Sequence, residues 1–447
     1  MVVTVLAAMV LVFAREMHTE AIASSNHAAN AQANWIARGA IEAIRGDLAE
    51  AVTNGEAPHL SEVEAQGMEL GGGMFWIIRP NYEDDQKHAF GLISEAGKIN
   101  INTASADVLV ECPGIDENLA AAIVDWRDED LDLTPGGAES EYYLTRPTPY
   151  NAKDGDFDTI GELLLVRDID AAIFYGEDTN QNGVLEPIEN DGSNNLPDDN
   201  SNGDLDRGLI DYLTVYSTEP DTDSAGDDRI SLNQPGQELN DLLTSAFGEE
   251  RFSEIAGEIN LQRPYQNVLD FYLRAELTED EFEAVHDQLT TQIQAFVLDF
   301  VPFTLIDVYY ASAEVIDALP GMDPGDGRLI VAARPDIPQG EQPGSLAWVA
   351  DALGEDKIAL VGASLTYRSY QFTADVVAIS GDGRGFCRLR VVLDVAPVLD
   401  GSATLPQIVY IQDLTARGWP LAPEVLTAVK AGTPLEQAAS MQDTSTP

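Results

Sequence analysis

The apolar positions at the start of the chain follow one helical pattern without interruption. Residues 1–14 carry no charge and are rich in β-branched and aliphatic side chains. At ~1.5 Å per residue this run spans roughly 21 Å as a helix, which is short of the ~30 Å core of a bilayer. Beyond Gln32 the pattern becomes amphipathic, with four apolar residues on one face, Ala37, Ile41, Ile44 and Leu48. We therefore predict one long helix over residues 1–55.

Short apolar runs bounded by polar turns predict a small antiparallel sheet. Residues 74–80 and 90–93 have the composition of strands. Near the other end of the chain, 365–379 and 386–395 predict a hairpin across the glycine-rich turn GDGRG, and 407–411 predicts a further strand. The strands are thus predicted in two separate parts of the chain.

The segment between these strands has helical periodicity. Two capping boxes mark helix starts, Thr159 with Glu162 and Thr278 with Glu281. The helix after Thr278 is predicted to present five apolar residues on one face, Leu289, Ile293, Phe296, Val297 and Phe300. The fold class is therefore α+β: a long N-terminal helix with a small antiparallel sheet, interrupted by a mostly helical domain.

One stretch of thirty residues occurs twice, at 98–127 and again at 305–334 without a gap. Both copies keep Ala-Ser-Ala, a Pro-Gly pair and a closing arginine, which predicts an extended lead-in, a helix, a tight turn and a second helix. Such a unit is a helix-hairpin-helix. Asn102 or Thr103 is expected to cap the first helix. The second copy has Tyr309 and Tyr310 there, so we expect its helix to be capped differently.

Charge argues against nucleic acid as the partner of these units. The chain has 24 basic and 77 acidic residues, a formal net charge of -53. Such a surface repels a polyanion, and each Pro-Gly turn is followed by an acid, Asp116 or Asp323. We therefore expect structural packing or protein contact. A membrane-anchored helix-hairpin-helix protein that binds or takes up DNA remains the alternative.

The twelve residues from Asp178 to Glu189 match the spacing of a calcium-binding loop. Oxygen-bearing side chains fall at positions 1, 3, 5, 9 and 12, position 6 is a glycine, and position 7 offers a backbone carbonyl. The predicted ligands are Asp178, Asn180, Asn182, Val184, Glu186 and Glu189. An incomplete second match has Leu209 at position 12, and its predicted ligands are Asp198, Asn200, Asn202, Asp204 and Asp206. The acidic loop 178–211 is thus expected to hold Ca²⁺ for structural reasons.

No catalytic residue is predicted. The five histidines are scattered without ligand-like spacing, and no nucleophile-elbow motif is present. The chain has two cysteines, Cys112 and Cys387, for which a disulfide and two buried free thiols are both open. We therefore expect a protein that acts by assembly, not an enzyme.

Four stretches in order resemble the K-type minor pseudopilins of bacterial type II secretion systems, the general secretion pathway protein K (GspK) family. They are QANWIARGAIEAI; GKININTA with its PGI turn and IVDWRDED; GGAESEYYLTRPTPYNAKDGDFDTIGELLLVRDI; and the second repeat with the C-terminal strands. The resemblance covers most of residues 30–335. Its most specific part is the GAE…YY…PY…ELLLV block, whose residue types follow from no simple periodicity.

The resemblance implies a role as well as a fold. It implies a pilin-like α+β domain, interrupted by a helical domain with helix-hairpin-helix (SAM-like) units that carries calcium. The protein would sit at the tip of a pseudopilus, with the I- and J-type minor pseudopilins and inner-membrane secretion components as partners. It would be anchored in the inner membrane by a single N-terminal helix, with its bulk in the periplasm, and would assist export of folded proteins across the outer membrane.

The predicted organisation has six segments. They are the membrane-anchoring, pilin-like helix 1–55, a small β region 56–98, the helical domain 99–300 with the first repeat and the calcium loop, the second repeat 301–345, a β-rich region 346–425 and a polar tail 426–447.

Overall fold

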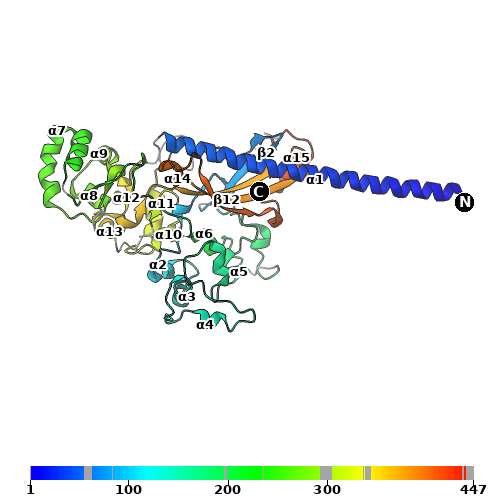
Figure 1. Ribbon diagram of the computed structural model, residues 1–447, viewed down its shortest axis with the longest axis horizontal. Coiled ribbons are helices and arrows are strands. Elements are labelled where there is room, and N and C mark those ends of the chain that lie inside the picture. Colours follow the sequence, from blue (N-terminus) through cyan, green and yellow to red (C-terminus); the bar gives the residue numbers. More distant parts are fainter. Residues whose placement is uncertain are drawn as a thin grey trace.

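The computed structural model describes residues 2–54, 63–82, 84–195, 199–234, 236–291, 305–335, 337, 344–434 and 437–438. Its dominant feature is the helix α1 (Val2–Thr53), as predicted. Figure 1 shows the N-terminal part of α1 extending away from the rest of the molecule, while its C-terminal part lies along the body. In the C-terminal part the expected face is buried, including Ala37, Ile41, Ile44 and Leu48. The projecting part exposes large apolar side chains such as Val10, Phe13 and Met17.

Among the described residues, no helix carries a stretch that is both long and apolar enough to cross a membrane.

An antiparallel sheet joins the two ends of the chain. Its main path is β1 (Met68–Leu70), β2 (Gly73–Arg79), β11 (Gln371–Ile379), β12 (Phe386–Asp394) and β13 (Gln407–Asp413). The short strands β3 (Ala89–Phe90) and β4 (Ile93–Ser94) pair with β2 and β11. The predicted hairpin is confirmed as β11 and β12, which pair over their full length. The central neighbours β2 and β11 come from opposite ends of the sequence, so everything between them is an insertion.

The two faces of the sheet are covered differently. Alternate residues point to one face, where Ile77, Val376 and Val391 pack against α1. On the other face Trp76 and Ile379 pack against α15 (Pro423–Lys430). The remainder of this second face carries charged residues, namely Asp375, Arg388 and Arg390, and it is here that part of the insertion docks. The short helix α14 (Ala396–Leu399) follows β12.

The insertion contains three units with the same frame. Each starts with a two-residue strand and ends with a Leu-Thr strand that pairs parallel to it in the same register. The pairs are β5 (Ile99–Asn100) with β6 (Leu213–Thr214), β7 (Ile230–Ser231) with β8 (Leu289–Thr290), and β9 (Ile306–Asp307) with β10 (Leu365–Thr366). After each opening strand the chain forms two helices joined by a turn. The sequence predicted two such units, and the middle one was missed.

Most of the helices within the units are short. The first unit contains α2 (Ala106–Glu111), α3 (Glu117–Arg127), α4 (Ser140–Tyr143), α5 (Ala171–Tyr175) and α6 (Leu209–Tyr212). The second contains α7 (Gln237–Leu261), α8 (Val268–Arg274) and α9 (Glu279–Glu283). The third contains α10 (Ala313–Asp317), α11 (Asp326–Ala333), α12 (Ala347–Leu353) and α13 (Glu355–Val361). Figure 1 shows the first unit below the sheet and the other two at the end away from the projecting helix.

In each unit, an arginine at the end of the second helix or just after it donates to a backbone carbonyl near the opening strand. Arg127 donates to the carbonyl of Ala104, and Arg334 donates to that of Ala311, the matching residue of the repeat. In the middle unit Nε of Arg263 donates to Leu232 O at 2.6 Å, as Nε of Arg334 does to Val308 O at 2.6 Å. The turn in this middle unit is Gly248, with φ 81°, which breaks α7 into two helices. The three units therefore share hydrogen bonds and not only element order.

Two local predictions were wrong. The helix after the first lead-in is capped by Ser105, whose side chain accepts from Val108 N, and not by Asn102 or Thr103. Ser312 caps the matching helix in the same way, so the two copies do not differ here. Asn102 instead makes two hydrogen bonds with the backbone of Phe157, which pins a later loop. Serine, asparagine and threonine are all good N-cap residues, and here Asn102 is engaged by Phe157 while Ser105 caps the helix.

The helix predicted after Thr278 is also shorter than expected. The capping box with Glu281 is confirmed, but α9 ends at Glu283. Leu289 lies in strand β8 and not on a helix, because it pairs with Ile230 of β7. The other apolar positions assigned to that helix, Ile293, Phe296, Val297 and Phe300, lie outside the described residues.

Candidate metal sites

The loop 178–189 leaves the first unit and lies against the second face of the sheet. Three of its predicted ligands are almost inaccessible, since Asp178 is 5% exposed, Asn182 2% and Glu189 1%. Such burial is unusual for acidic side chains that have no cationic partner. The sequence predicted a calcium loop here without predicting its burial, and the structure places these residues in a protein interior.

Hydrogen bonds within the loop wind it around Asp178. One carboxylate oxygen of Asp178 accepts from Asn182 N at 3.0 Å, and the other accepts from Gly183 N at 2.8 Å. The side-chain oxygen of Asn182 accepts from Val184 N at 2.9 Å. Gly183 has φ 76°, a left-handed conformation that favours glycine at this position of the loop. The oxygen of the Asn180 side chain is buried and has no hydrogen-bond partner among the described residues.

The second half of the loop returns to its start. The carboxylate of Glu189 accepts from the backbone N–H of Thr179 at 2.9 Å and from that of Glu186 at 3.1 Å. Glu186 in turn accepts from the amide of Asn182 at 3.2 Å. Burial, together with the charge of the nearby Asp178, raises the pKa of Glu189 to about 7. Burial likewise raises the pKa of Asp178 to about 6, with the charge of Asp211 adding to the effect. Hydrogen bonds thus link Asp178, Asn182, Glu186 and Glu189 within the loop, while Arg388 offsets only part of the charge of Asp178.

The second predicted loop is more open. Asp198 lies outside the described residues. The other four predicted ligands are linked mainly to one another, since Asn200 donates to Asp206 at 2.6 Å and accepts from Asn202 N at 2.9 Å. Asn202 accepts from Asp204 N at 2.8 Å. These side chains are exposed. The structure therefore gives this loop a turn geometry but no buried group of carboxylates among the described residues.

A third acidic loop, 128–139, was missed by the sequence analysis. Asp128, Asp130 and Glu139 each place a carboxylate oxygen within 4.8 Å of the other two. Glu139 is 6% exposed, and both of its carboxylate oxygens are buried without a hydrogen-bond partner in the described part of the chain. One oxygen of Asp128 is in the same state. Burial raises the pKa of Glu139, and Asp125 and Asp128 add to this by charge repulsion.

The spacing of this third loop could have revealed it. Acids stand at positions 1, 3, 5 and 12 of the twelve residues from Asp128 to Glu139, which is the ligand pattern of a calcium loop. Leu133 occupies position 6 in place of the usual glycine, so a search that required glycine passed over it. Near the end of this loop, Gly137 lies so close to Asp125 that a side chain at 137 would collide with the carboxylate of Asp125.

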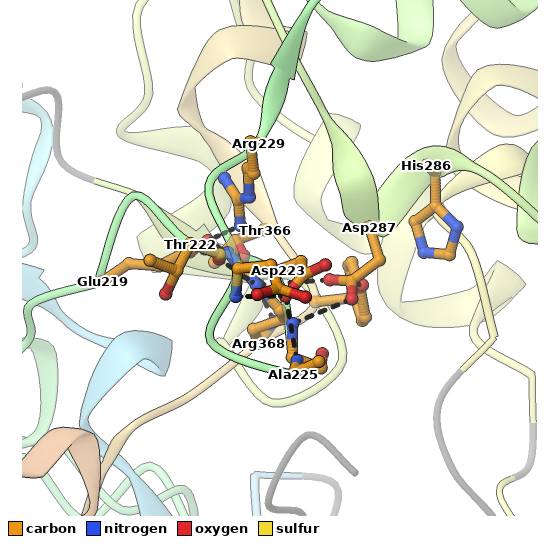
Figure 2. Close-up of polar contacts among 12 residues, drawn as sticks. Glu219, Thr222, Asp223, Ala225, Arg229, His286, Asp287, Thr366 and Arg368 are labelled. Carbon is orange, nitrogen blue, oxygen red and sulfur yellow. Dashed lines mark hydrogen bonds and ion pairs between the residues drawn. The ribbon is translucent and has the colours of Figure 1, made fainter. Parts of the chain in front are cut away.

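A buried ion-pair cluster joins the three units (Figure 2). Glu219, just after the first unit, accepts from Arg229 at 2.7 Å and from Thr366 at 2.7 Å, and it pairs with Arg368. Arg368 also contacts Asp287, from the end of the middle unit, at 3.2 Å. Arg368 is 2% exposed, so its charge is neutralised within the protein. This cluster fixes the closing strands of the units relative to one another.

Both cysteines, Cys112 and Cys387, are free and buried. Of the two alternatives left open by the sequence, the structure selects two separate thiols.

Part of the chain matches a known family. Residues 97–175 match the model of a family described as type II secretion system (T2SS), protein K. The match lies in the first unit and includes the loop 128–139. Over these residues it bears out the resemblance predicted from the sequence, first to type II secretion systems and then, among their components, to protein K.

A similar solved chain comes from the crystal structure of the GspK-GspI-GspJ complex from enterotoxigenic Escherichia coli type 2 secretion system. It is 13% identical, the alignment covers 86% of this chain and 95% of that chain, and the TM-score is 0.37. No curated protein matches the chain.

Proposed function

We propose that this protein is a minor pseudopilin of a type II secretion system and acts at the tip of the pseudopilus in the export of folded proteins. The observation that carries the proposal is the match of residues 97–175 to protein K. The fold supports it, because a helix that projects from a compact body presents a surface for packing against sister helices. The I- and J-type minor pseudopilins are the partners that the family resemblance implies, together with inner-membrane secretion components.

The size and place of the insertion support the tip position. The three units occupy one end and one side of the body, opposite the projecting part of α1. A subunit with such a bulk at the end away from the projecting helix leaves no room for another subunit to add at that end. The protein would then end the filament by steric exclusion. The projecting helix would anchor the subunit in the inner membrane and leave the body in the periplasm.

Excising the insertion tests the tip proposal. The hydroxyl oxygens of Ser94 and Ser369 lie 2.9 Å apart, so a short Gly-Ser linker can replace residues 97–367 without moving β4 or β11. We expect longer pseudopili, counted by electron microscopy in cells that assemble them, because the cap is gone. Unchanged filament length with a folded, membrane-bound variant would contradict the proposal. Mass spectrometry of the mature N-terminus should show a cleaved, N-methylated residue.

We also propose that the chain binds calcium at the loops 178–189 and 128–139, and more weakly at 199–206. Two features support a hard cation. The carboxylates of Asp128, Asp130 and Glu139 converge, and each of the first two loops holds buried oxygens without partners among the described residues, namely Asn180 Oδ1 and both oxygens of Glu139. Bound calcium would supply the positive charge that these sites lack.

Isothermal titration of the full chain with calcium tests this proposal. We expect Glu189→Gln and Glu139→Gln each to remove one strong site. Each variant should lower the melting temperature only when calcium is present. Equal melting of variant and parent protein with calcium and with chelator would rule out binding at that loop.

A further inference from the structure

Arginine side chains of the sheet and of the segment after it donate hydrogen bonds to the backbone of the loop 178–189. Arg388 donates to the carbonyl of Asn180 at 2.6 Å and also to that of Gln181. Arg417 donates to the carbonyl of Thr179 at 2.9 Å. In the opposite direction, the amide of Asn182 donates to the carbonyl of Pro420 at 3.0 Å. Four consecutive residues of the loop are thus tied to the segment that follows β11.

These hydrogen bonds depend on the buried charge of Arg388. Arg388 is fully buried, and it donates through Nε and Nη2 to the two oxygens of Asp375 at 2.8 and 2.7 Å. Arg390 shares Asp375 and also contacts Gln181. Undocking the loop would remove two carbonyl acceptors from the guanidinium of Arg388. The sheet therefore has a preformed socket for this loop.

The other side of the loop meets the β2–β3 connection. The backbone N–H of Leu185 donates to Asp85 O at 2.8 Å. At Gly183 an added Cβ would lie 2.8 Å from Cα of Pro80, so the backbone of the loop sits directly against the sheet. The loop is therefore held on both sides, by residues that come before and after the insertion in sequence.

The groups that would bind the ion and those that contact the sheet come from the same short stretch, residues 178–182. Asp178, Asn180 and Asn182 offer side-chain oxygens, while the carbonyls of Thr179, Asn180 and Gln181 face the arginines. We propose that the loop 178–189 is a calcium-dependent clasp that holds the helical insertion on the sheet. This inference rests on the proposed calcium binding at the loop. An ion fixes the backbone shape that the arginine socket accepts, and its removal lets the buried carboxylates push the loop apart.

Hydrogen exchange of the full chain, with calcium and with chelator, tests the clasp. We expect chelation to speed exchange about tenfold in the loop 178–189 and also in the segment 414–421, which supplies Arg417 and Pro420. Glu189→Gln in calcium should behave like the chelated protein. Arg417→Ala should speed exchange in the loop while calcium still binds, as measured by titration. Arg384→Ala, an exposed arginine at the β11–β12 turn that contacts Ser25 and Asp382, is the matched control and should change neither.

The outcomes separate the two proposals. If calcium binds and protects the loop but leaves 414–421 unchanged, the clasp is overturned and calcium binding stands. If titration shows no binding that Glu189→Gln removes, the calcium proposal at this loop fails, and the clasp fails with it. Arg417→Ala is a surface change, so its effect can be read even if variants of buried Arg388 do not fold.

Discussion

The first and third units of the insertion share a frame but differ in what the frame encloses. Both open with a two-residue strand, a Ser-capped helix and a closing arginine, and both end in Leu-Thr. The third unit closes after α13, with the same spacing between its paired strands as the middle unit. The first unit encloses a longer segment, which carries all three candidate calcium loops. The frame shared by the units therefore provides stability, and the additional segment of the first unit provides the candidate calcium loops.

The contact between sheet and loop is where the first unit differs most from the third, and breaking it should have the largest effect. Arg388→Met leaves Asp375 buried with only Arg390 as its cation, so we expect the free energy of unfolding to fall by about 3 kcal/mol or more. Urea denaturation measures the loss. The control in the third unit is Lys357→Met, which removes a surface ion pair with Asp323 and Asp326 and should cost far less. Equal losses would contradict the difference between the units.

The calcium-sensitive part of the pH dependence of stability should come from the first unit. Buried Asp307 in the third unit, whose pKa burial also raises to about 7, adds a part that calcium does not change. Burial raises the pKa of Asp178 to about 6 and that of Glu189 to about 7, from ordinary values of 3.8 and 4.5. The folded state therefore retains protons that the unfolded chain has released, and the free energy of unfolding falls as pH rises from about 4.5 to 7 when calcium is absent. Thermal melting in chelator should show this fall, and Glu189→Gln should reduce it. Calcium at pH 7 should reverse it. A flat profile in chelator would show that these carboxylates are ionised in the fold.

The shared frame predicts equal effects at matched positions. Arg127→Ala and Arg334→Ala each remove a charged donor from the carbonyl that opens the helix pair, and each should cost about 1.5–3 kcal/mol. Parallel urea titrations compare the two. A large difference between them would show that the repeat is one of sequence more than of energetics.

The smallest expected effect is at the helix starts. Ser105→Ala and Ser312→Ala each remove the side-chain acceptor of a helix N-cap and should cost about 1 kcal/mol. Thr103→Ala is the control, since Thr103 precedes the cap that the structure assigns to Ser105. If Thr103→Ala proved as costly as Ser105→Ala, the assignment of the cap would be wrong.

Regular patterns in the sequence predicted the parts of the fold that depend on local order. The long helix follows from its apolar face, the hairpin from its glycine-rich turn, and two of the units from their Pro-Gly turns. The middle unit has neither the Ala-Ser-Ala start nor the Pro-Gly turn. Its opening isoleucine and its closing Leu-Thr match those of the other two units, and pairing between distant two-residue strands leaves no local signal in the sequence.

The candidate sites divide in the same way. Ligand spacing identified the loop 178–189, because twelve consecutive residues carry the pattern. Its burial was not predictable, since Arg388 and Arg390 reach it from a strand about two hundred residues later in the sequence. The loop 128–139 was missed through strict use of one glycine position, although its acids have the full spacing.

The pairing of β2 with β11 has a consequence for how the chain folds. These central strands cannot meet until the whole insertion has been made, so the sheet has a high contact order and should form late. A folded insertion eases this, because its two ends are brought side by side at Ser94 and Ser369. The entropic cost of closing the sheet is then that of a short loop and not of a long one. The helical units would thus act as a template that brings the two halves of the sheet together.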